Sequence, residues 1–307
     1  MPAGEKTMYL TGFADEAAGD IDGQIRATKD LGWENIESRN INGKNIHDIS
    51  DEEFDVVCGK IEEAGVKINC FGSAIANWGK SIEEPFDSSL EEARRAIPRM
   101  QRLGAGLVRI MSFGILKGRG PEDQMAEERF ARVRELHRMF TDEGITPVHE
   151  NCMNYGGMGW TYTMRLLEAV PGLKLVFDTG NPVMTDDMAK DEPRPKQSSW
   201  DFYSHVKEHI AYVHIKDGRF LREKPDSTFP EAEFTFPGEG DGDVRRIVGD
   251  LLKCGYDGGI SIEPHLAVVF HEDSAGSAED VRFANYVEYG RRMMAILDEA
   301  RGGSAGK

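Results

Sequence analysis

The chain has 307 residues, of which 39% are hydrophobic and 30% are charged, and its formal net charge is −17 at pH 7. This length suffices to bury a large core, while the acidic charge argues against a nucleic-acid partner because phosphate binding needs a basic surface. No stretch approaches the ~18 apolar residues of a membrane span, and the scattered cysteines form no CxxC pair, so we expect a cytoplasmic protein without membrane insertion.

Short apolar runs alternate along the chain with longer segments of helical periodicity. The expected strands are residues 8–14, 35–40, 67–73, 107–113, 146–151, 173–179, 211–217 and 259–265. The expected helices are residues 17–31, 51–64, 86–103, 122–143, 160–170, 199–209, 243–254 and 278–300. A glycine typical of αβ turns separates helix from strand in several units, at Gly32, Gly65, Gly104 and Gly144.

Successive βα units predict a parallel sheet, and their number and length favour a closed (β/α)8 TIM barrel over a doubly wound sheet. Because no linker or change in composition interrupts the chain, residues 1–307 are predicted to form a single domain, with an ordered core of about 8–300. Two connections, residues 181–198 and 218–242, are long and follow the sixth and seventh strands. Long loops on this face form substrate pockets or lids, or alternatively a surface elaboration or a partner interface.

The fifth to the eighth strands all end in polar side chains, within "PVHENC", "VFDTGN", "YVHIKD" and "ISIEPH". These strands are neighbours in a barrel, so their polar residues are predicted to converge on one point. The residues are Glu150, Asp178, His214 and Glu263. Carboxylates and an imidazole suit a hard or borderline divalent ion, such as Mn²⁺, Mg²⁺, Co²⁺ or Zn²⁺, and buried carboxylates without a cation would repel one another.

Motifs along almost the whole chain resemble those of the xylose-isomerase-like TIM-barrel sugar phosphate isomerases and epimerases. They are "LTGFADE", "IESRNINGKNI", "HENCMNYGGMG", "FDTGNP", "HIKDG", "PGEGDGDV" and "ISIEPH". The resemblance implies that the Glu–Asp–His–Glu set binds one divalent ion, with Mn²⁺ as the expected one, and that Glu150 and Glu263 form an acid/base pair. Many relatives have a substrate-contacting histidine where this chain has Asn181. The family-2 AP endonucleases share the barrel of this family, and they need further histidines for a three-ion cluster. The matching motifs of this chain lack those histidines.

The expected chemistry begins with a sugar whose carbonyl and neighbouring hydroxyl chelate the ion, which stabilises an enediolate. Glu150 and Glu263 would then move protons on opposite faces, giving a carbohydrate isomerase or epimerase. The alternative enzyme is a metal-dependent lyase on a 3-oxo sugar, similar to the C-glycoside deglycosidase catalytic subunits, which pair with a small β-sandwich chain, or to inosose dehydratases. A sugar-binding barrel without turnover is the non-enzymatic alternative. The family resemblance also implies a homo-oligomer.

Further residues are predicted to contact the substrate or assist catalysis. His149 is either a second base or a buried structural histidine, because strand alternation points it away from Glu150. Lys216 shares the inward face of His214, where it binds a substrate oxygen or pairs with a ligand carboxylate. The remaining predicted substrate contacts are Arg219, Asn181, Trp160 as a sugar-stacking ring, Arg39 and His47.

Overall fold

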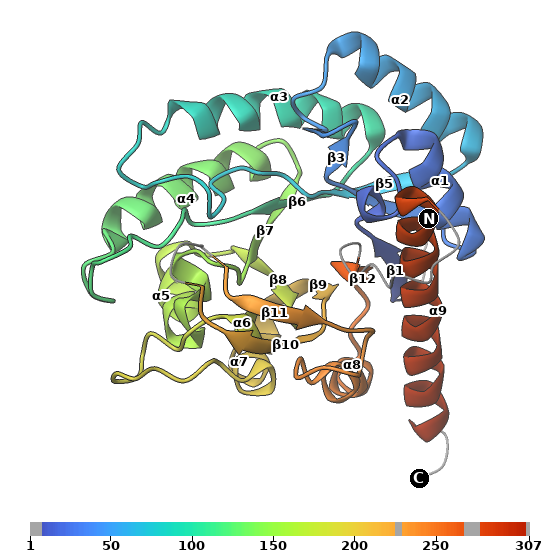
Figure 1. The fold of residues 1–307 in the computed structure, drawn as a ribbon. Coiled ribbons are helices and arrows are strands. Elements are labelled where there is room, and N and C mark those ends of the chain that lie inside the picture. Colours follow the sequence, from blue (N-terminus) through green and yellow to red (C-terminus); the bar gives the residue numbers. More distant parts are fainter. Residues whose placement is uncertain (1–7, 225–228, 267–276, 305–307) are drawn as a thin grey trace.

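The computed structural model describes residues 8–224, 229–266 and 277–304. For residues 303 and 304 it describes the backbone alone. Its centre is an eight-stranded parallel sheet that curls into a barrel, in the order β1-β12-β9-β8-β7-β6-β5-β2. Helices surround this barrel (Figure 1). The predicted TIM barrel is therefore confirmed, and each predicted strand is found within one or a few residues of its expected position.

The barrel strands show why apolar runs end in polar residues. They are β1 (Tyr9–Gly12), β2 (Asn35–Ser38), β5 (Lys67–Phe71), β6 (Leu107–Ile110), β7 (Thr146–Glu150), β8 (Lys174–Asp178), β9 (Ile210–Ile215) and β12 (Gly259–Ile262). Val148, Val176 and Tyr212 pack together inside the barrel. Because side chains alternate between faces, the residues two positions later also point inward, at the carboxyl end.

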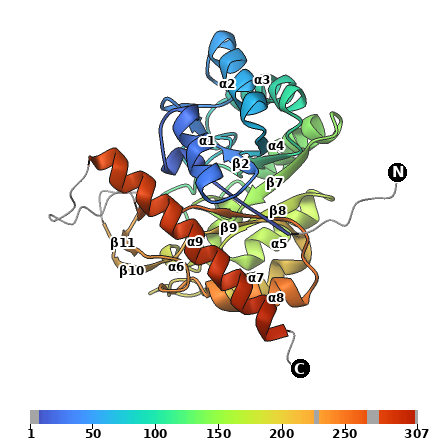
Figure 2. The same ribbon diagram turned by 90° about the vertical axis from the view of Figure 1, so that its right-hand side faces the viewer.

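The main helices follow the strands as predicted. They are α1 (Ile21–Asp30), α2 (Asp51–Ala64), α3 (Asp87–Leu103), α4 (Ala126–Thr141), α5 (Trp160–Ala169), α7 (Ser199–Val206), α8 (Val244–Lys253) and α9 (Ala278–Ser304). Gly65 and Gly104 end α2 and α3 in the left-handed conformation, with φ of 67° and 68°, which glycine adopts without steric cost. Figure 2 shows α9 crossing the outside of the barrel beside α1 and α8. Among the described residues, no helix combines the length and the apolarity needed to cross a bilayer.

The two long connections contain structure of their own. Residues 181–198 begin with the short helix α6 (Asn181–Met184), and residues 218–242 contain an antiparallel hairpin of β10 (Gly218–Arg222) and β11 (Glu231–Phe234). In Figure 1 this hairpin lies next to α6. A smaller hairpin of β3 (Asn40–Ile41) and β4 (Lys44–Asn45) follows β2. Short 3₁₀ turns η1 (Ala14–Glu16), η2 (Tyr155–Met158) and η3 (Lys207–His209) complete the described elements.

The barrel closes between β1 and β2, which stand at the two ends of the sheet order. Within the described residues, these strands are joined by an isolated parallel bridge between Phe13 and Glu37. The hydroxyl of Thr11 adds a hydrogen bond of 3.0 Å to the carbonyl of Asn35. We call this junction the β1–β2 seam.

Candidate metal centre

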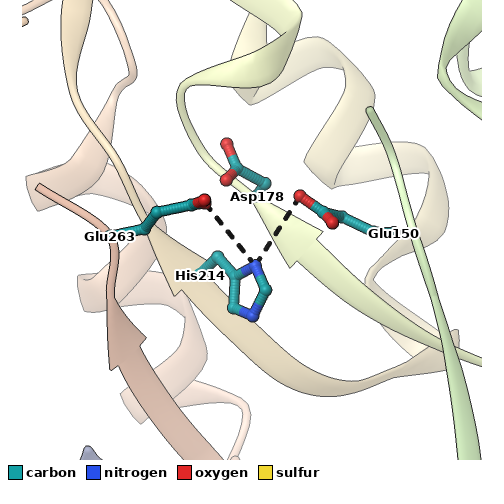
Figure 3. Close-up of side chains that lie close together, drawn as sticks. All are labelled: Glu150, Asp178, His214 and Glu263. Atoms are coloured by element: carbon teal, nitrogen blue, oxygen red, sulfur yellow. Dashed lines mark ion pairs between the residues drawn. The ribbon is translucent and has the colours of Figure 1, made fainter. Parts of the chain in front are cut away.

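The four predicted ligands converge at the carboxyl end of the barrel. Glu150 and Asp178 end β7 and β8, His214 lies near the end of β9, and Glu263 follows β12. Each offers one ligand atom, and all these atoms lie within 4.8 Å of one another. All four residues are buried. Figure 3 shows Glu150 and Glu263 on opposite sides of the imidazole of His214, with Asp178 between them.

The unsatisfied atoms of this cluster fit a cation. His214 Nδ1 has no hydrogen-bond partner, although it lies 3.7 Å from a carboxylate oxygen of Glu150 and 3.8 Å from one of Glu263. Asp178 Oδ2 is buried and makes no well-directed hydrogen bond, although Lys216 Nζ lies 3.0 Å away as an ion-pair partner. Its other oxygen accepts hydrogen bonds of 2.8 and 2.7 Å from the amides of Gly180 and Asn181. Carboxylate oxygens and an imidazole nitrogen that face one another in one buried cluster are the ligands that a divalent ion accommodates.

Three cationic side chains surround the carboxylates. Arg109 NH1 lies 3.1 Å from Glu150 Oε2. Lys216 Nζ lies 3.0 Å from Asp178 Oδ2 and 3.1 Å from Glu263 Oε2, and Arg39 NH1 lies 3.2 Å from Glu263 Oε1. Lys216 therefore makes the ion pair that was one of its two predicted roles. Glu150 therefore contacts one of these cations and Glu263 contacts two, which gives the two carboxylates different surroundings.

The electrostatics of the cluster without an ion depend on protons. Burial raises the pKa of Asp178 to about 7, and Glu263 and Glu150 add to this rise while Lys216 opposes it. Burial lowers the pKa of His214, but Glu37 and Glu150 outweigh burial and raise that pKa to about 10. The cluster thus holds positive charge as protons, and a divalent ion that binds there would displace them.

Glu37 holds His214 from behind. Its carboxylate oxygens lie 3.1 and 3.0 Å from His214 Nε2, and both side chains are fully buried. In the neutral imidazole that a metal ion requires, this contact keeps the remaining proton on Nε2 and leaves the Nδ1 lone pair facing the other ligands. Glu37 therefore orients one of the candidate metal ligands.

We expect Glu37→Gln to weaken Mn²⁺ binding by roughly 10–100-fold, the usual effect of losing a carboxylate behind a ligating histidine. The neutral amide keeps the shape of the side chain but no longer stabilises the imidazole by charge. Calorimetric titration with Mn²⁺ measures the change. Glu233→Gln, which alters an exposed carboxylate paired with Arg219, is the matched control. Unchanged affinity in Glu37→Gln would show that Glu37 does not act through His214.

A second acidic group lies beside Glu263. His265 Nδ1 is 2.9 Å from Glu16 Oε1, and its Nε2 is 3.6 Å from Glu263 Oε1. Arg39 joins Asp15 and Glu16, at 2.9 and 3.1 Å, to the same glutamate. The turn η1 after β1, with the sequence "ADE", therefore holds Glu263 in place through Arg39 and His265.

A cavity of about 370 Å³ opens above the cluster. We call it the site cavity. Its charged and amide lining includes Glu150, Glu263, Arg39, Arg109, Lys216 and Asn181. Asn181 also donates a hydrogen bond of 3.1 Å to Glu150 Oε1. Trp78 and Phe229 form an apolar part of the wall, so the cavity combines polar groups that fix orientation with aromatic surface, as sugar-sized sites do.

Three residues predicted to contact substrate lie outside this lining. Trp160, at the start of α5, stacks on His205 with ring centroids 3.8 Å apart. His47 is fully buried and lies 3.3 Å from a carboxylate oxygen of Asp48. Arg219 is on β10 and pairs with Glu233 at 3.2 Å. These predictions placed residues by chain position, and the folds of the loops direct the side chains elsewhere.

His149 lies on the outer face of β7. It is fully buried, and its Nε2 is 3.0 Å from the hydroxyl of Ser112. The chain at Gly156 packs directly against its ring. Burial lowers its pKa to about 4, so the imidazole is neutral near pH 7. This placement corresponds to the predicted alternative of a structural histidine.

Arg109 and Glu16 are the site residues that the sequence prediction did not single out. Arg109 is a charge within the apolar run "LVRIMSF", two residues after Leu107 on the inward face. A lone arginine inside a barrel strand needs a buried anion, which was the available signal. Glu16 lies in a turn outside any strand, where side-chain periodicity gives no direction.

Comparisons with known proteins agree with the fold. The solved structure of a xylose isomerase-like TIM-barrel protein from Mycobacterium smegmatis in complex with magnesium is 16% identical, covers 95% of this chain and 98% of that chain, and has a TM-score of 0.66. An L-ribulose 3-epimerase is 16% identical over 97% of this chain and 96% of its own, with a TM-score of 0.66. The 3-keto-D-glucoside 4-epimerase of E. coli is 16% identical over 94% and 100%, with a TM-score of 0.60.

At these identities the likeness concerns the fold alone. No curated protein matches the chain significantly. A family model described as xylose isomerase-like TIM barrel matches residues 25–286, which is most of the sequence. The chain therefore belongs to the xylose isomerase-like TIM-barrel family.

Proposed function

We propose that this protein is a divalent-metal-dependent carbohydrate isomerase or epimerase, with Mn²⁺ as the expected ion. The observation that carries the proposal is the pair of glutamates on opposite sides of a shared metal-binding cluster (Figure 3). Two carboxylates that face a substrate from opposite sides are suited to removing a proton on one face and supplying one on the other.

The surroundings of the glutamates support separate roles. Arg109 and His214 outweigh burial and lower the pKa of Glu150 to about 2, so this carboxylate is ionised near neutral pH. Glu263 lies between Lys216 and Arg39, which are positioned to receive substrate oxygens beside it. Asn181 holds Glu150 from the other side and also lines the site cavity.

The divalent ion, held by Glu150, Asp178, His214 and Glu263, would polarise a substrate carbonyl as a Lewis acid. Arg39 and Lys216 would bind neighbouring hydroxyl oxygens, because both line the cavity and carry several donors.

The test is mass spectrometry of products formed in D₂O by the Mn²⁺-loaded protein. The panel contains free ketoses, ketose phosphates and 3-oxo-glycosides, each with a chelator-treated control. The expected result is an isomer of the substrate in which one carbon-bound hydrogen has been replaced by deuterium. This product should be absent after chelation.

Other products would replace the proposal. Loss of water or release of an aglycone would identify a lyase, the alternative that uses the same ligands. Binding of sugar without exchange of any carbon-bound proton would identify a binding protein.

A further inference from the structure

A second cavity of about 330 Å³ adjoins the site cavity. Trp78 lines both cavities. Cys152 lines the site cavity and the next residue, Met153, lines the second cavity. In the same way, Phe229 lines the site cavity and Pro230 lines the second. The two hollows therefore share one wall. We call the second hollow the methionine groove, after Met153, Met184 and Met188 in its lining.

The shared wall exposes aromatic surface. Trp78 and Phe229 are 37% and 38% exposed. Their rings meet edge to face, with centroids 4.7 Å apart. Covering exposed aromatic surface with a ligand is favourable, and adjacent exposed rings beside a cavity are typical of binding sites. Their position between the two cavities indicates a ligand that passes across them.

The apolar lining of the groove favours one chemistry. Ile115, Pro230 and the methionines supply flexible, polarisable surface, and thioether sulfurs pack well against aromatic rings. Lys196, at the edge, pairs with Asp186 at 2.8 Å and with Glu223. The hydroxyl of Thr185 donates to the carbonyl of Asn181. Lys117, the remaining charged residue of the lining, is engaged as well. With these polar groups engaged, the groove suits an apolar ring better than a second sugar.

We infer that the substrate is a sugar carrying an aromatic substituent, with the sugar in the site cavity and the ring in the methionine groove. The inference rests on the proposed function, because that function places the sugar at the metal cluster. Each cavity is near the lower end of the roughly 300–1,000 Å³ typical of ligand sites, so the two together fit a two-part ligand. The groove then selects among sugars of the same chemistry by what they carry.

The experiment compares matched methyl and p-nitrophenyl glycosides of common hexoses, with their 3-oxo forms, bound to the full-length protein. Saturation-transfer NMR is recorded with Mg²⁺ in place of paramagnetic Mn²⁺. We expect the strongest saturation on the aromatic protons and about tenfold or more tighter binding of the aryl sugar, as burial of an aromatic ring provides.

Variants locate the ring. Met153→Gln and Met188→Gln are expected to bring the ratio of aryl to methyl affinity close to one. Met294→Gln alters a methionine that is 37% exposed on α9, and it should leave the ratio at its wild-type value. A wild-type ratio in both groove variants would overturn the assignment.

The remaining outcomes separate this inference from the proposed function. Equal binding of methyl and aryl sugars, or preference for a sugar phosphate, would overturn the aromatic substrate and leave the isomerase intact. Aromatic saturation that the groove variants abolish, without deuterium incorporation into any sugar, would support the groove and contradict the isomerase. No binding of any aryl sugar at millimolar concentration would overturn the inference.

Discussion

Glu150→Gln is expected to reduce turnover by roughly 10²–10⁴-fold, the range for loss of a positioned acid or base. The amide keeps the size of the side chain but accepts no proton and is a poorer ligand for a hard cation. Arg109 would also lose the carboxylate that it contacts at 3.1 Å. Turnover of the sugar identified in D₂O, measured at saturating Mn²⁺, reports the change.

Metal content separates the two parts of this effect. Elemental analysis of purified Glu150→Gln shows whether the ion is still bound, and Glu233→Gln provides the control for removing a surface carboxylate. Retention of both full metal occupancy and full turnover would exclude Glu150 from the site. Bound metal with lost turnover would identify Glu150 chiefly as the group that moves the proton.

Arg129→Leu is expected to cost about 3–5 kcal/mol of the free energy of unfolding, because several buried carbonyls lose their donors together. Arg129 is fully buried, and its guanidinium donates to the carbonyls of Ser112, Phe113, Gly114 and Gln124 at 2.5 to 2.9 Å. Burial lowers its pKa to about 10, so it stays charged near neutral pH. This loss is large, because the total free energy of unfolding of a native protein is only about 5–15 kcal/mol.

Urea denaturation followed by circular dichroism measures this loss. Arg129→Lys keeps the charge but cannot reach all the carbonyls, so an intermediate loss is expected. Arg165→Leu removes an exposed arginine paired with Glu122 and should change the stability by less than about 0.5 kcal/mol. A similarly small loss in Arg129→Leu would mean that water replaces the guanidinium in this loop.

The fold and the metal cluster were predictable because both depend on regular periodicity. Alternation within β7, β8 and β9 fixes the direction of every second side chain, and the neighbouring order of the strands brings the ends together. Glycines after the helices marked the turns. Trp160, at the start of α5, and Arg219, on β10, lie outside the barrel strands, so the alternation of those strands does not fix their direction and their substrate contacts stay predictions. The oligomeric state and any partner chain stay predictions, since neither follows from a single chain.

Residues missed in the site have a common cause. Arg109 pairs with the carboxylate of Glu150, which becomes buried only when the strands are assembled. The hairpin of β10 and β11 likewise forms within a connection that has weak strand periodicity. Glu16 approaches Glu263 through His265, although 246 residues separate the two glutamates in the sequence. Contacts of this kind follow from the closed barrel and cannot be read before its geometry is known.

The β1–β2 seam has few backbone bonds, and side chains of the metal centre compensate for them. Glu37, on β2, reaches His214 across the interior, while Arg39, directly after β2, pairs with Asp15 and Glu16, which follow β1. Separation of β1 from β2 would therefore move side chains that contact the candidate metal cluster. Binding of an ion at the cluster and pairing of the two strands are thermodynamically linked, because a ligand that binds the paired arrangement more tightly makes separation of the strands rarer.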